Sequence, residues 1–456
     1  MSAALWTAAE LCRATGGTLA SEVAVSGVSI DSRSVAPGDL FVALRDMRDG
    51  HHFAADALAR GAVCAMADRD PPGVPTDAPL LRVADTLRGL AALGAAGRAR
   101  FEGRTVAITG SVGKTGTKEM LRLLLGALGE THAAVASYNN HWGVPLTLAR
   151  CPRGAAYAVV EIGMNHPGEI APLSRLARPH VAVVTTVGAA HIGHLGGMDA
   201  IAAEKAAIAE GLEPGGAAVL PADSPHLDVL LRATRGARVL FFGEGGDARV
   251  TALSSDAEGS TVSADIAGRA VEFRLGAPGA HLVRNALCAL AAVAALGADP
   301  AAVAHRLRDV QPMQGRGAQE RVPTPDGGAA TVIDESFNGQ PPSMRAAIAL
   351  LRLVPAKRRV AVLGQMGELG NFAAAEHRAL AAPVREAADL VFACGPEMRR
   401  LVEALPSELV AAYGETSAEL APLVAAAIRD GDAVLIKGSK AMLMGRVLSA
   451  LRRDAA

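Results

Sequence analysis

Short apolar runs alternate with longer segments of helical periodicity along most of the chain. From about residue 104 the apolar runs are RTVAITG, AYAVVEIG, HVAVVTTVG, AAVLPAD and RVLFFGE, with helix-like segments between them. A strand that is covered by helices on both faces is apolar throughout, so this pattern is typical of a buried parallel sheet. It predicts consecutive βαβ units in the middle of the chain.

Three other regions depart from this pattern or repeat it. Residues 1–100 begin with short β-like runs, pass through a turn rich in Gly and Pro, and end in a helix rich in Ala, Leu and Arg. Residues 249–275 show period-2 runs broken by Gly, which indicate antiparallel strands. From Gln311 the alternation of apolar and helical segments resumes with ATVIDES, RVAVLGQMG, DLVFACG and DAVLIKGSK. The last region therefore predicts a second parallel sheet.

We predict an α/β protein with three domains. A small N-terminal α/β domain is expected over residues 1–100 and a central domain, with a mainly parallel sheet plus a small antiparallel sheet, over 101–310. A Rossmann-like, doubly wound domain is expected over 311–456. The length of 456 residues agrees with three domains of about 150 residues each. Ligands on such sheets bind at the carboxyl ends of the strands, where most of the unusual polar residues fall.

Composition narrows the classes of function. The chain has 45 Lys and Arg against 46 Asp and Glu, and this balance argues against a broad basic face and a nucleic-acid partner. The longest apolar stretch, 286–297, is shorter than the roughly 20 residues that span a bilayer, and the N-terminus lacks the features of a signal peptide. Five scattered cysteines without a CxxC pair indicate reduced thiols. We expect a cytoplasmic monomer without membrane insertion.

The strongest motif is a candidate phosphate-binding loop, TVAITGSVGKTGTKEM, at residues 105–120. An apolar run is followed by a Gly-rich turn, and a helix is expected to begin at Lys114. Backbone N–H groups at such a helix N-terminus bind phosphate oxygens, while Lys114 would reach the terminal phosphates of ATP and Thr115 would bind Mg²⁺. The usual GxxxxGK[ST] pattern fails because Ile108 stands at its first position, which leaves the shorter TGxxGKT. The candidate loop contacts to ATP are Gly110, Ser111, Gly113, Lys114 and Thr115.

A carboxylate, a histidine and a lysine in the same half of the chain are weaker candidates. Glu161 ends an apolar run, where a buried carboxylate is costly unless it is paired or binds a metal; a strand-terminal Glu facing a loop is the alternative. His191 lies in the turn GAAHIGHLGG, where His194 competes with it and a simple loop histidine is the commoner case. Lys205 lies in a helix-like segment, and periodicity alone makes it a solvated lysine.

Seven tracts occur in one order across nearly the whole chain, and together they resemble the Mur ligases. The tracts are TGSVGKTGTKEM, YNNHWGVPLTL, EIGMNHPGEI, AHIGHLGGMDAIAAEKAAI, HLVRNALCA, DESFNGQPPSM and VLIKGSKAMLMGRVL. Single motifs are shared with folylpolyglutamate synthetase. The resemblance implies a UDP-binding N-terminal domain, a central ATPase domain and a Rossmann-like C-terminal domain. NNxxGVPLTL, EIGMNHPGEI and DxSxNxxPxSM point to the family member that adds D-Ala-D-Ala to UDP-N-acetylmuramoyl-tripeptide.

The resemblance also assigns residues to the phosphates and the metal. It places Lys114 on the β- and γ-phosphates, and it places Thr115, Glu161 and His191 around Mg²⁺. It implies that Lys205 is carbamylated, which is chemically reasonable because an ammonium repels Mg²⁺ whereas a carbamate presents a carboxylate-like group. Lys114, Lys205 and His191 are therefore the candidate catalytic residues.

Contacts to the rest of ATP and to the UDP-linked substrate are implied in the same way. For ATP these are Asn285 and Asn338 near the adenine, Arg316 on the nucleotide and Asp334 on the ribose. The substrate candidates are Ser29, Asp31, Ser32 and Arg33 in the turn SIDSR, with Asn139 and Asn140 in YNNHWGVPLTL. Without the resemblance, SIDSR is simply a polar turn after a strand.

Two C-terminal tracts differ from the family pattern. Where the family has YNANPDS, this chain has FNGQPPS at 337–343, which removes a tyrosine hydroxyl, an asparagine and an aspartate. Where the family has GDMLELG, this chain has GQMGELG, with Gln365 in place of Asp. The two tracts are those to which the resemblance assigns adenine and second-substrate contacts, so the family pattern assigns fewer residues there than at the phosphate loop.

The expected activity is ATP-dependent amide ligation in peptidoglycan precursor synthesis. The tripeptide carboxylate attacks the γ-phosphate of ATP to give an acyl phosphate and ADP, and the amine of D-Ala-D-Ala then displaces phosphate. Another P-loop amide ligase, such as a folylpolyglutamate synthetase or a different Mur ligase, and a non-catalytic ATP-binding switch stay open as alternatives. About 100 residues precede the phosphate loop, a region that folate enzymes lack, and a switch need not keep a full metal set. The sequence leaves meso-diaminopimelate and lysine open at peptide position three.

Overall fold

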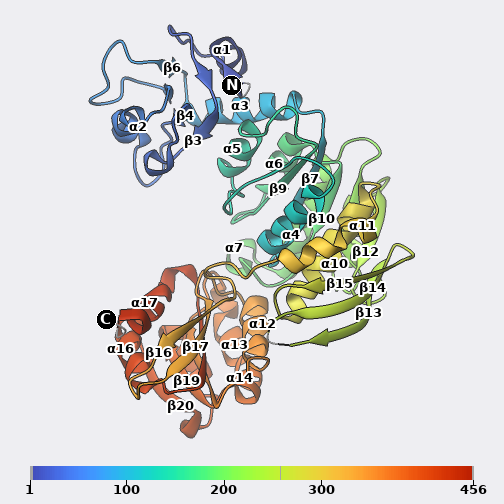
Figure 1. The fold of residues 1–456 in the computed structure, drawn as a ribbon, viewed down its shortest axis with the longest axis vertical. Helices are drawn as coiled ribbons and strands as arrows, with labels where there is room; N and C mark the ends of the chain where they lie inside the picture. Colours follow the sequence, from blue (N-terminus) through green and yellow to red (C-terminus); the bar gives the residue numbers. More distant parts are fainter. Residues whose placement is uncertain (1–3, 257, 454–456) are drawn as a thin grey trace.

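Three α/β blocks follow one another along the chain, and the central block lies between the other two (Figure 1). The computed structural model describes residues 4–256 and 258–453. Each block has its own sheet, with four, nine and six strands in turn. Because these sheets are mainly parallel and alternate with helices, the predicted α/β class is confirmed. The domain bounds taken from the sequence stay predictions.

The N-terminal block contains a four-stranded parallel sheet and a two-stranded antiparallel one. The parallel sheet has the order β3 (Gly27–Ser29), β4 (Asp39–Val42), β5 (Cys64–Ala67), β6 (Leu80–Arg82). The other elements are β1 (Trp6–Thr7), β2 (Ala24–Val25), α1 (Ala8–Thr15), α2 (Ala54–Ala59) and α3 (Thr86–Ala99). Side chains alternate along a strand, so Leu40 and Val42 pack with α1 and α3 while Phe41 packs with α2. Burial on both faces explains why β4 is apolar throughout.

The central block is built on a nine-stranded sheet. In spatial order its strands are β15 (Arg269–Leu275), β14 (Ser260–Ile266), β13 (Ala248–Ser255), β12 (Arg238–Phe242), β11 (Ala217–Pro221), β10 (Val181–Val184), β7 (Arg104–Thr109), β9 (Tyr157–Glu161) and β8 (Thr131–Ala133). β13, β14 and β15 pair antiparallel, as residues 249–275 predict, and they join the parallel strands through the single pair Phe242 and Ala248.

Helices cover both faces of the parallel part of the central sheet. They are α4 (Lys114–Gly126), α5 (Gly143–Ala149), α6 (Ile170–Ala177), α7 (Ile192–Leu195), α8 (Met198–Ala206), α9 (Leu227–Ala233), α10 (Ala280–Ala295) and α11 (Pro300–Val303). Along β7, Val106 and Ile108 pack with α4 and α10, whereas Ala107 packs with α6. This doubly covered arrangement leaves the carboxyl ends of β7, β9 and β10 as the open edge at which ligands bind.

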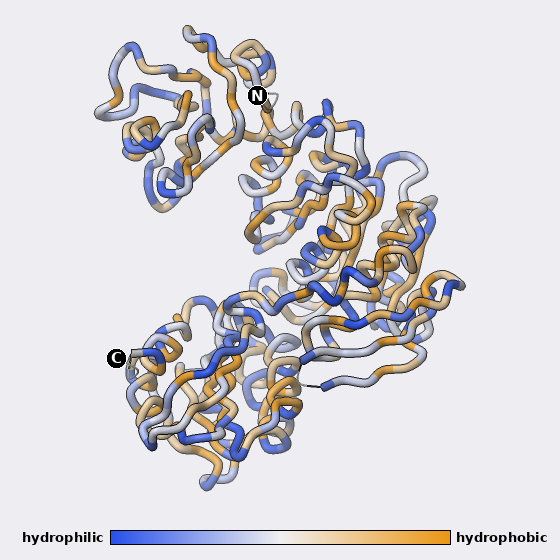
Figure 2. The backbone as a smooth tube through the Cα atoms, viewed as in Figure 1, coloured by the Kyte–Doolittle hydropathy of each residue, from blue (hydrophilic) through white to orange (hydrophobic). Residues whose placement is uncertain are grey.

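The C-terminal block is doubly wound around a six-stranded sheet. Its strand order is β16 (Ala318–Pro323), β17 (Ala329–Glu335), β21 (Asp432–Lys437), β18 (Arg358–Gly364), β19 (Leu390–Cys394), β20 (Val410–Gly414), and only the β16–β17 pair is antiparallel. Its helices are α12 (Pro341–Leu351), α13 (Ala373–Arg378), α14 (Ala381–Ala387), α15 (Arg399–Val402), α16 (Ser417–Ala427) and α17 (Gly445–Arg453). Hydrophobic segments gather inside each of the three blocks, and many hydrophilic segments lie on their outer loops (Figure 2).

The N-terminal block is attached to the central block by a close helix contact. Helices α3 and α5 approach so closely that a Cβ atom at Gly94 would lie 2.7 Å from Pro145 O, and one at Gly97 would lie 2.3 Å from Leu148 O. Glycine at these two positions lets the backbones touch, which holds α3 against the central block.

Candidate active site

The loop between β7 and α4, residues 110–113, has a strand before it and a helix after it, as the sequence predicts. Gly110 and Gly113 have positive φ angles of 148° and 88°. A Cβ atom at Gly110 would lie 1.9 Å from Thr185 Oγ1, and one at Gly113 would lie 2.6 Å from Asn285 Oδ1. Glycine fits both positions because it has no Cβ. The loop therefore presents backbone N–H groups at the N-terminus of α4, the arrangement that binds phosphate.

Ser111, a predicted ATP contact, anchors this loop to the segment that follows β10. Its Oγ atom donates to Gly188 O at 2.8 Å, and its backbone N–H donates to Thr186 O at 3.0 Å. These bonds attach the phosphate loop to residues 186–188. The same segment leads into α7 and contains His191 a few residues later.

Lys114 begins α4, and its side chain folds back over the loop. Its Nζ atom donates to Gly110 O at 2.6 Å. Burial lowers the pKa of Lys114; the nearby Glu161 carboxylate opposes this shift and the Arg316 guanidinium adds to it. A cation, a carboxylate and a second cation thus converge on the phosphate loop, from the central block and from the linker to the C-terminal block.

Ser137 joins two of the predicted residues and was not singled out from the sequence. Its Oγ atom lies 3.1 Å from Thr115 Oγ1 and accepts from an Nη atom of Arg316 at 3.4 Å. The Arg316 guanidinium also stacks on the Phe337 ring, 4.2 Å from its centroid. Arg316 therefore connects the segment beside the phosphate loop with Phe337 of the C-terminal block.

Glu161 stands at the end of β9 and is 1% exposed. Its Oε1 atom accepts from Asn139 Nδ2 at 2.8 Å, whereas its Oε2 atom is buried and has no hydrogen-bond partner among the described residues. A buried carboxylate oxygen without a partner is costly unless it meets a cation. Asn139, a predicted substrate contact, orients this carboxylate, and the Asn140 side chain accepts from the backbone N–H of Gly143, the first residue of α5, at 2.9 Å.

Lys205 lies on α8 and is 2% exposed. This burial is inconsistent with the solvated lysine that periodicity alone suggests. In the part of the chain that the structure describes, its Nζ atom makes no hydrogen bond. Burial, together with the Lys114 cation, lowers the pKa of Lys205 well below its usual value, although Glu204 opposes the shift. The amine is therefore buried close to Lys114, in surroundings that favour its neutral form.

His191 lies immediately before α7 and has a left-handed backbone, with φ at 61°. Its Nδ1 atom lies 2.5 Å from Oε2 of Glu368, a residue of the C-terminal block. The neighbouring His191 is the main cause that lowers the pKa of Glu368. The competing His194 is exposed and packs edge-on against His166, with ring centroids 5.2 Å apart. Of the two histidines, His191 is the one held in place by the fold.

The described residues contain no cluster of three or more His, Cys, Asp or Glu side chains with metal-binding spacing. A Mg²⁺ site here would therefore need hydroxyl, phosphate or carbamate oxygens in addition to Glu161. The unpartnered Oε2 atom of Glu161 and the unbonded amine of Lys205 fit such a site. Both residues are buried, and Oε2 of Glu161 has no hydrogen-bond partner among the described residues.

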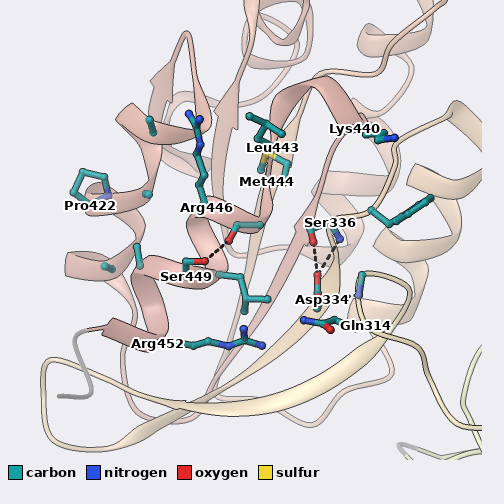
Figure 3. A pocket seen from close by; sticks show the side chains of 18 of the residues that line it. Gln314, Asp334, Ser336, Pro422, Lys440, Leu443, Met444, Arg446, Ser449 and Arg452 are labelled. Atoms are coloured by element: carbon teal, nitrogen blue, oxygen red, sulfur yellow. Dashed lines mark hydrogen bonds between the residues drawn. The ribbon is translucent and has the colours of Figure 1, made fainter. Parts of the chain in front are cut away.

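Asp334 and Asn338 lie in the C-terminal block, Asp334 near the end of β17 and Asn338 in the loop between β17 and α12. Asp334 Oδ2 accepts from Gly315 N at 2.8 Å, and its Oδ1 atom accepts from the Ser336 hydroxyl at 2.6 Å. A cavity of about 1190 Å³ opens beside Asp334 and Ser336, between the linker and helices α16 and α17 (Figure 3). Asn338 Oδ1 accepts from the backbone of Gly339 at 2.9 Å. Asp334 thus ties the linker to the C-terminal block in addition to its predicted ribose contact.

The turn SIDSR lies at the carboxyl end of β3, in a different block from the phosphate loop. Asp31 forms an ion pair with Arg33, with 2.7 Å between Oδ2 and an Nη atom, and this hydrogen bond is the main cause that lowers the pKa of Asp31 to about 2. Ser29 Oγ donates to Asp31 O at 3.1 Å, and Ser32 is buried. The four predicted substrate residues are therefore neighbours in one turn.

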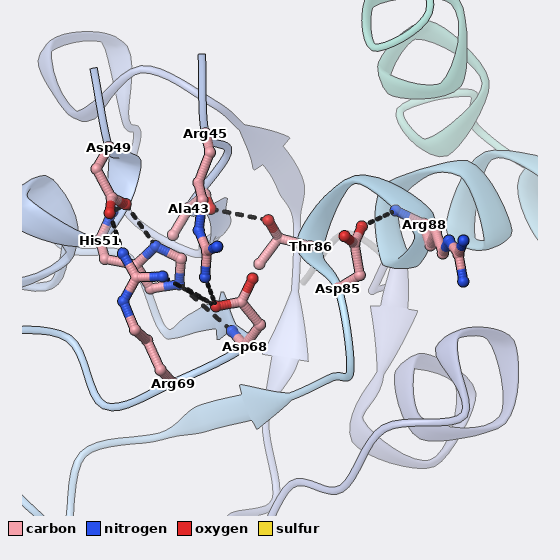
Figure 4. A network of polar contacts seen from close by, with 9 residues as sticks. All are labelled: Ala43, Arg45, Asp49, His51, Asp68, Arg69, Asp85, Thr86 and Arg88. Carbon is pink, nitrogen blue, oxygen red and sulfur yellow. Dashed lines mark hydrogen bonds and ion pairs between the residues drawn. The ribbon is translucent and has the colours of Figure 1, made fainter. Parts of the chain in front are cut away.

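A second polar network at the carboxyl ends of β4 and β5 was missed by the sequence analysis (Figure 4). His51 is fully buried; its Nδ1 atom lies 2.7 Å from Asp49 Oδ1, and its Nε2 atom accepts from Asp68 N at 3.3 Å. Arg45 and Arg69 pair with the two carboxylates. The network fixes the two loops that border the same sheet edge as the SIDSR turn.

The similarity to known proteins extends over nearly the whole chain. Three family models match consecutive parts of the chain: "Mur ligase family, catalytic domain" at 24–97, "Mur ligase middle domain" at 108–293, and "Mur ligase, glutamate ligase domain" at 319–440. The UDP-N-acetylmuramoyl-tripeptide–D-alanyl-D-alanine ligase of Synechocystis is 33% identical over 453 residues, which cover 97% of this chain and 95% of that protein. The chain belongs to the Mur ligase family.

Solved structures agree with this assignment. A crystal structure of MurF from Acinetobacter baumannii superimposes on this Mur ligase with a TM-score of 0.85 and 32% identity, covering 98% of this chain and 99% of that one. MurF ligase from Thermotoga maritima, solved in complex with ADP, gives a TM-score of 0.77 at 27% identity and covers 94% and 98% of the two chains. In this Mur ligase, no helix within 4–256 and 258–453 is long and apolar enough to cross a membrane.

Proposed function

We propose that this Mur ligase uses ATP to join D-Ala-D-Ala to UDP-N-acetylmuramoyl-tripeptide, forming ADP and phosphate, in cytoplasmic peptidoglycan precursor synthesis. The observation that carries the proposal is the full-length match to ligases of that name by a chain whose phosphate loop is intact. The SIDSR turn and the phosphate loop lie in different blocks, so the UDP-linked substrate and ATP would occupy separate sites.

The residues around the phosphate loop suit attack by a carboxylate on the γ-phosphate. The N–H groups at the start of α4 and the Lys114 cation would compensate the charge that develops on the phosphate oxygens, and Arg316 would add a second cation. The tripeptide carboxylate then becomes an acyl phosphate, and the D-Ala-D-Ala amine displaces phosphate to form the amide. Holding the two reacting groups together supplies much of the rate acceleration.

We assign Mg²⁺ to Thr115, Glu161 and His191. When bound, Mg²⁺ would neutralise charge on the phosphate oxygens and orient them. Asn139 supports the assignment because it holds the Glu161 carboxylate in place through Oε1 and leaves Oε2 free. The chain therefore holds a buried carboxyl group near the phosphate loop and near Lys114.

We also propose that Lys205 is carbamylated. The reaction requires the neutral amine, which attacks CO₂ and loses a proton to give the carbamate. Lys205 is buried next to Lys114, and these surroundings lower the pKa of its amine, which favours the neutral form that the reaction needs. The carbamate would convert the repulsion between two lysines into an attraction and would give the metal a second anionic ligand beside Glu161.

The C-terminal block is expected to move toward the central block during the reaction, because ATP and the UDP-linked substrate must meet away from water. The linker at 310–317 is the expected hinge, since it contains Pro312 and the positive-φ residues Gly315 and Gly317. Small-angle scattering with an ATP analogue plus UDP-N-acetylmuramoyl-tripeptide should show a smaller radius of gyration than the free protein. Superimposable scattering curves would count against closure.

ADP release by the purified protein tests the choice of substrate. UDP-N-acetylmuramoyl-tripeptides with meso-diaminopimelate or with lysine at position three should be compared, each with and without D-Ala-D-Ala. We expect ADP release only when a tripeptide and D-Ala-D-Ala are both present. Release with UDP-N-acetylmuramoyl-dipeptide plus a free amino acid, or with a folate plus glutamate, would instead indicate a different amide ligase.

A further inference from the structure

The central and C-terminal blocks touch where α7 meets the tract GQMGELG, residues 364–370. The Gly193 backbone N–H donates to Glu368 O at 3.0 Å, and a Cβ atom at Gly193 would lie 2.7 Å from Gly370 N. Ile192 and Leu369, on the two sides of this contact, are both buried in one apolar cluster that continues from block to block. The contact is therefore a packed junction and not a passing approach of two loops.

Two side chains meet across this junction, and both have unusual backbones. His191 Nδ1 and Glu368 Oε2 are 2.5 Å apart, and each residue has a φ angle of 61°. The described residues include only three other non-glycine residues with positive φ: Arg178, Ala267 and Leu443. Side chains strongly disfavour this conformation, and where a fold maintains it the residue is commonly functional. The fold thus maintains strain on both sides of a single contact.

The segment that carries Glu368 is fixed to the C-terminal block. The Met366 backbone N–H donates to Nε2 of the buried His377 at 2.8 Å, and His377 Nδ1 lies 2.7 Å from Ala373 O. Ser439 N donates to Gln365 O at 3.0 Å. Glu368 therefore moves with the C-terminal block, whereas His191 belongs to the central block.

A neutral imidazole has one nitrogen that donates and one that accepts. If Nδ1–H of His191 points to the Glu368 carboxylate, then Nε2 carries the lone pair that a metal needs. Carboxylates commonly hold metal-binding histidines in this way. In the structure His191 Nδ1 and Glu368 Oε2 lie 2.5 Å apart but are not aligned as a hydrogen bond, so this pairing would need the ring to reorient.

We propose that Glu368 is a positioning residue that reaches from the C-terminal block and orients His191 as a ligand of Mg²⁺. The proposal rests on the assignment of His191 to Mg²⁺ made above, and it adds a dependence of the metal site on the position of the C-terminal block. When the junction is open, His191 loses the group that fixes its tautomer and its ring orientation. The same tract that departs from the family pattern at Gln365 thus keeps the glutamate that faces the metal region.

Mn²⁺ binding, followed by electron paramagnetic resonance in the presence of a non-hydrolysable ATP analogue, tests the proposal without turnover. Glu368→Gly is expected to weaken Mn²⁺ binding about 10-fold, the low end of losses on removal of a group that supports a metal ligand. Glu368→Gln should lose less, because its amide oxygen still accepts from Nδ1. The thermal midpoint of Glu368→Gly should not fall, since glycine adopts positive φ freely. A matched control is Glu376→Gln, which removes the charge of a carboxylate paired with Arg345 in the same block and should leave Mn²⁺ binding unchanged.

A His191→Ala variant distinguishes a failure of the metal assignment of His191 from a failure of the positioning role of Glu368. If it weakens Mn²⁺ binding but both Glu368 variants bind as wild type, the role of Glu368 is wrong and the metal assignment stands. If His191→Ala itself binds Mn²⁺ as wild type, the metal assignment is wrong and the role of Glu368 falls with it. Weakened binding in His191→Ala and Glu368→Gly, with an unchanged Glu376→Gln control, supports both.

Discussion

Replacing Lys114 by Ala is expected to lower the turnover number by about 10²–10³-fold, the usual loss when a preorganised electrostatic contact to a developing charge is removed. The Lys114 cation lies over the phosphate loop and is the only lysine of the described residues that donates to a carbonyl of that loop. Without it, negative charge on the transferring phosphoryl group is left partly uncompensated. Steady-state ADP release with saturating ATP, UDP-N-acetylmuramoyl-tripeptide and D-Ala-D-Ala measures the loss.

Lys357→Ala is the matched control for Lys114. Lys357 is exposed on the C-terminal block and pairs with Asp430 at 2.6 Å, and surface ion pairs of this kind contribute little. It should retain wild-type turnover. Near-normal turnover in a folded Lys114→Ala protein would contradict the phosphate-loop assignment.

Lys205→Ala is expected to lose nearly all ligase activity while it retains ATP binding, because Lys114 and Thr115 remain in place. If the carbamate supplies a metal ligand, a small carboxylate should partly replace it in the space that the side chain leaves. Activity of Lys205→Ala should therefore return in part with added formate or acetate. Lys205→Glu should have little activity, because the glutamate side chain is shorter than a lysine carbamate and would not reach the metal. Activity against formate concentration, with ATP binding measured separately, gives both readouts.

The rescue distinguishes a missing ligand from a damaged fold. Formate should have no effect on Lys114→Ala, in which a cation has been removed. Wild-type turnover of Lys205→Ala would contradict the carbamate proposal, and inactive protein that also fails to bind ATP would mean that the substitution disturbs the fold around α8.

The strand–loop–helix unit around the phosphate loop could be predicted from the sequence because its signal is local. The apolar strand, the glycines and the start of α4 all lie within about 20 consecutive residues. The parallel sheets were predictable for the same reason, since burial on both faces makes each strand apolar by itself. The period-2 pattern of residues 249–275 predicted the antiparallel strands. It did not predict that these strands join the parallel sheet through the pair Phe242 and Ala248.

The contacts that complete the site depend on residues far apart in sequence. Ser137 approaches Arg316 across 179 positions, and no local pattern marks that meeting. Lys205 has the periodicity of a surface residue, and it is buried because other elements of the central block pack around α8. Only the family resemblance identified it as a candidate.

Two further groups were missed because their residue types are common on protein surfaces. The network around His51 consists of aspartates and arginines that are unremarkable singly, and the network forms only when the loops after β4 and β5 meet. Glu368 was noticed as part of a variant tract, but its contact with His191 depends on the packing of two blocks. The hydrogen bond from Asn139 to Glu161 was also missed, because it depends on the three-dimensional position of β9; the substrate contact of Asn139 stays a prediction.

The central claim, that this chain forms an amide through an acyl phosphate, is tested most directly with ¹⁸O-labelled substrate. Purified protein is given ATP, D-Ala-D-Ala and UDP-N-acetylmuramoyl-tripeptide with ¹⁸O in the reacting carboxylate, and the products are analysed by mass spectrometry. We expect one ADP for each UDP-N-acetylmuramoyl-pentapeptide, with one ¹⁸O transferred to the released phosphate. Formation of AMP, phosphate without ¹⁸O, or ADP release without pentapeptide would contradict the account.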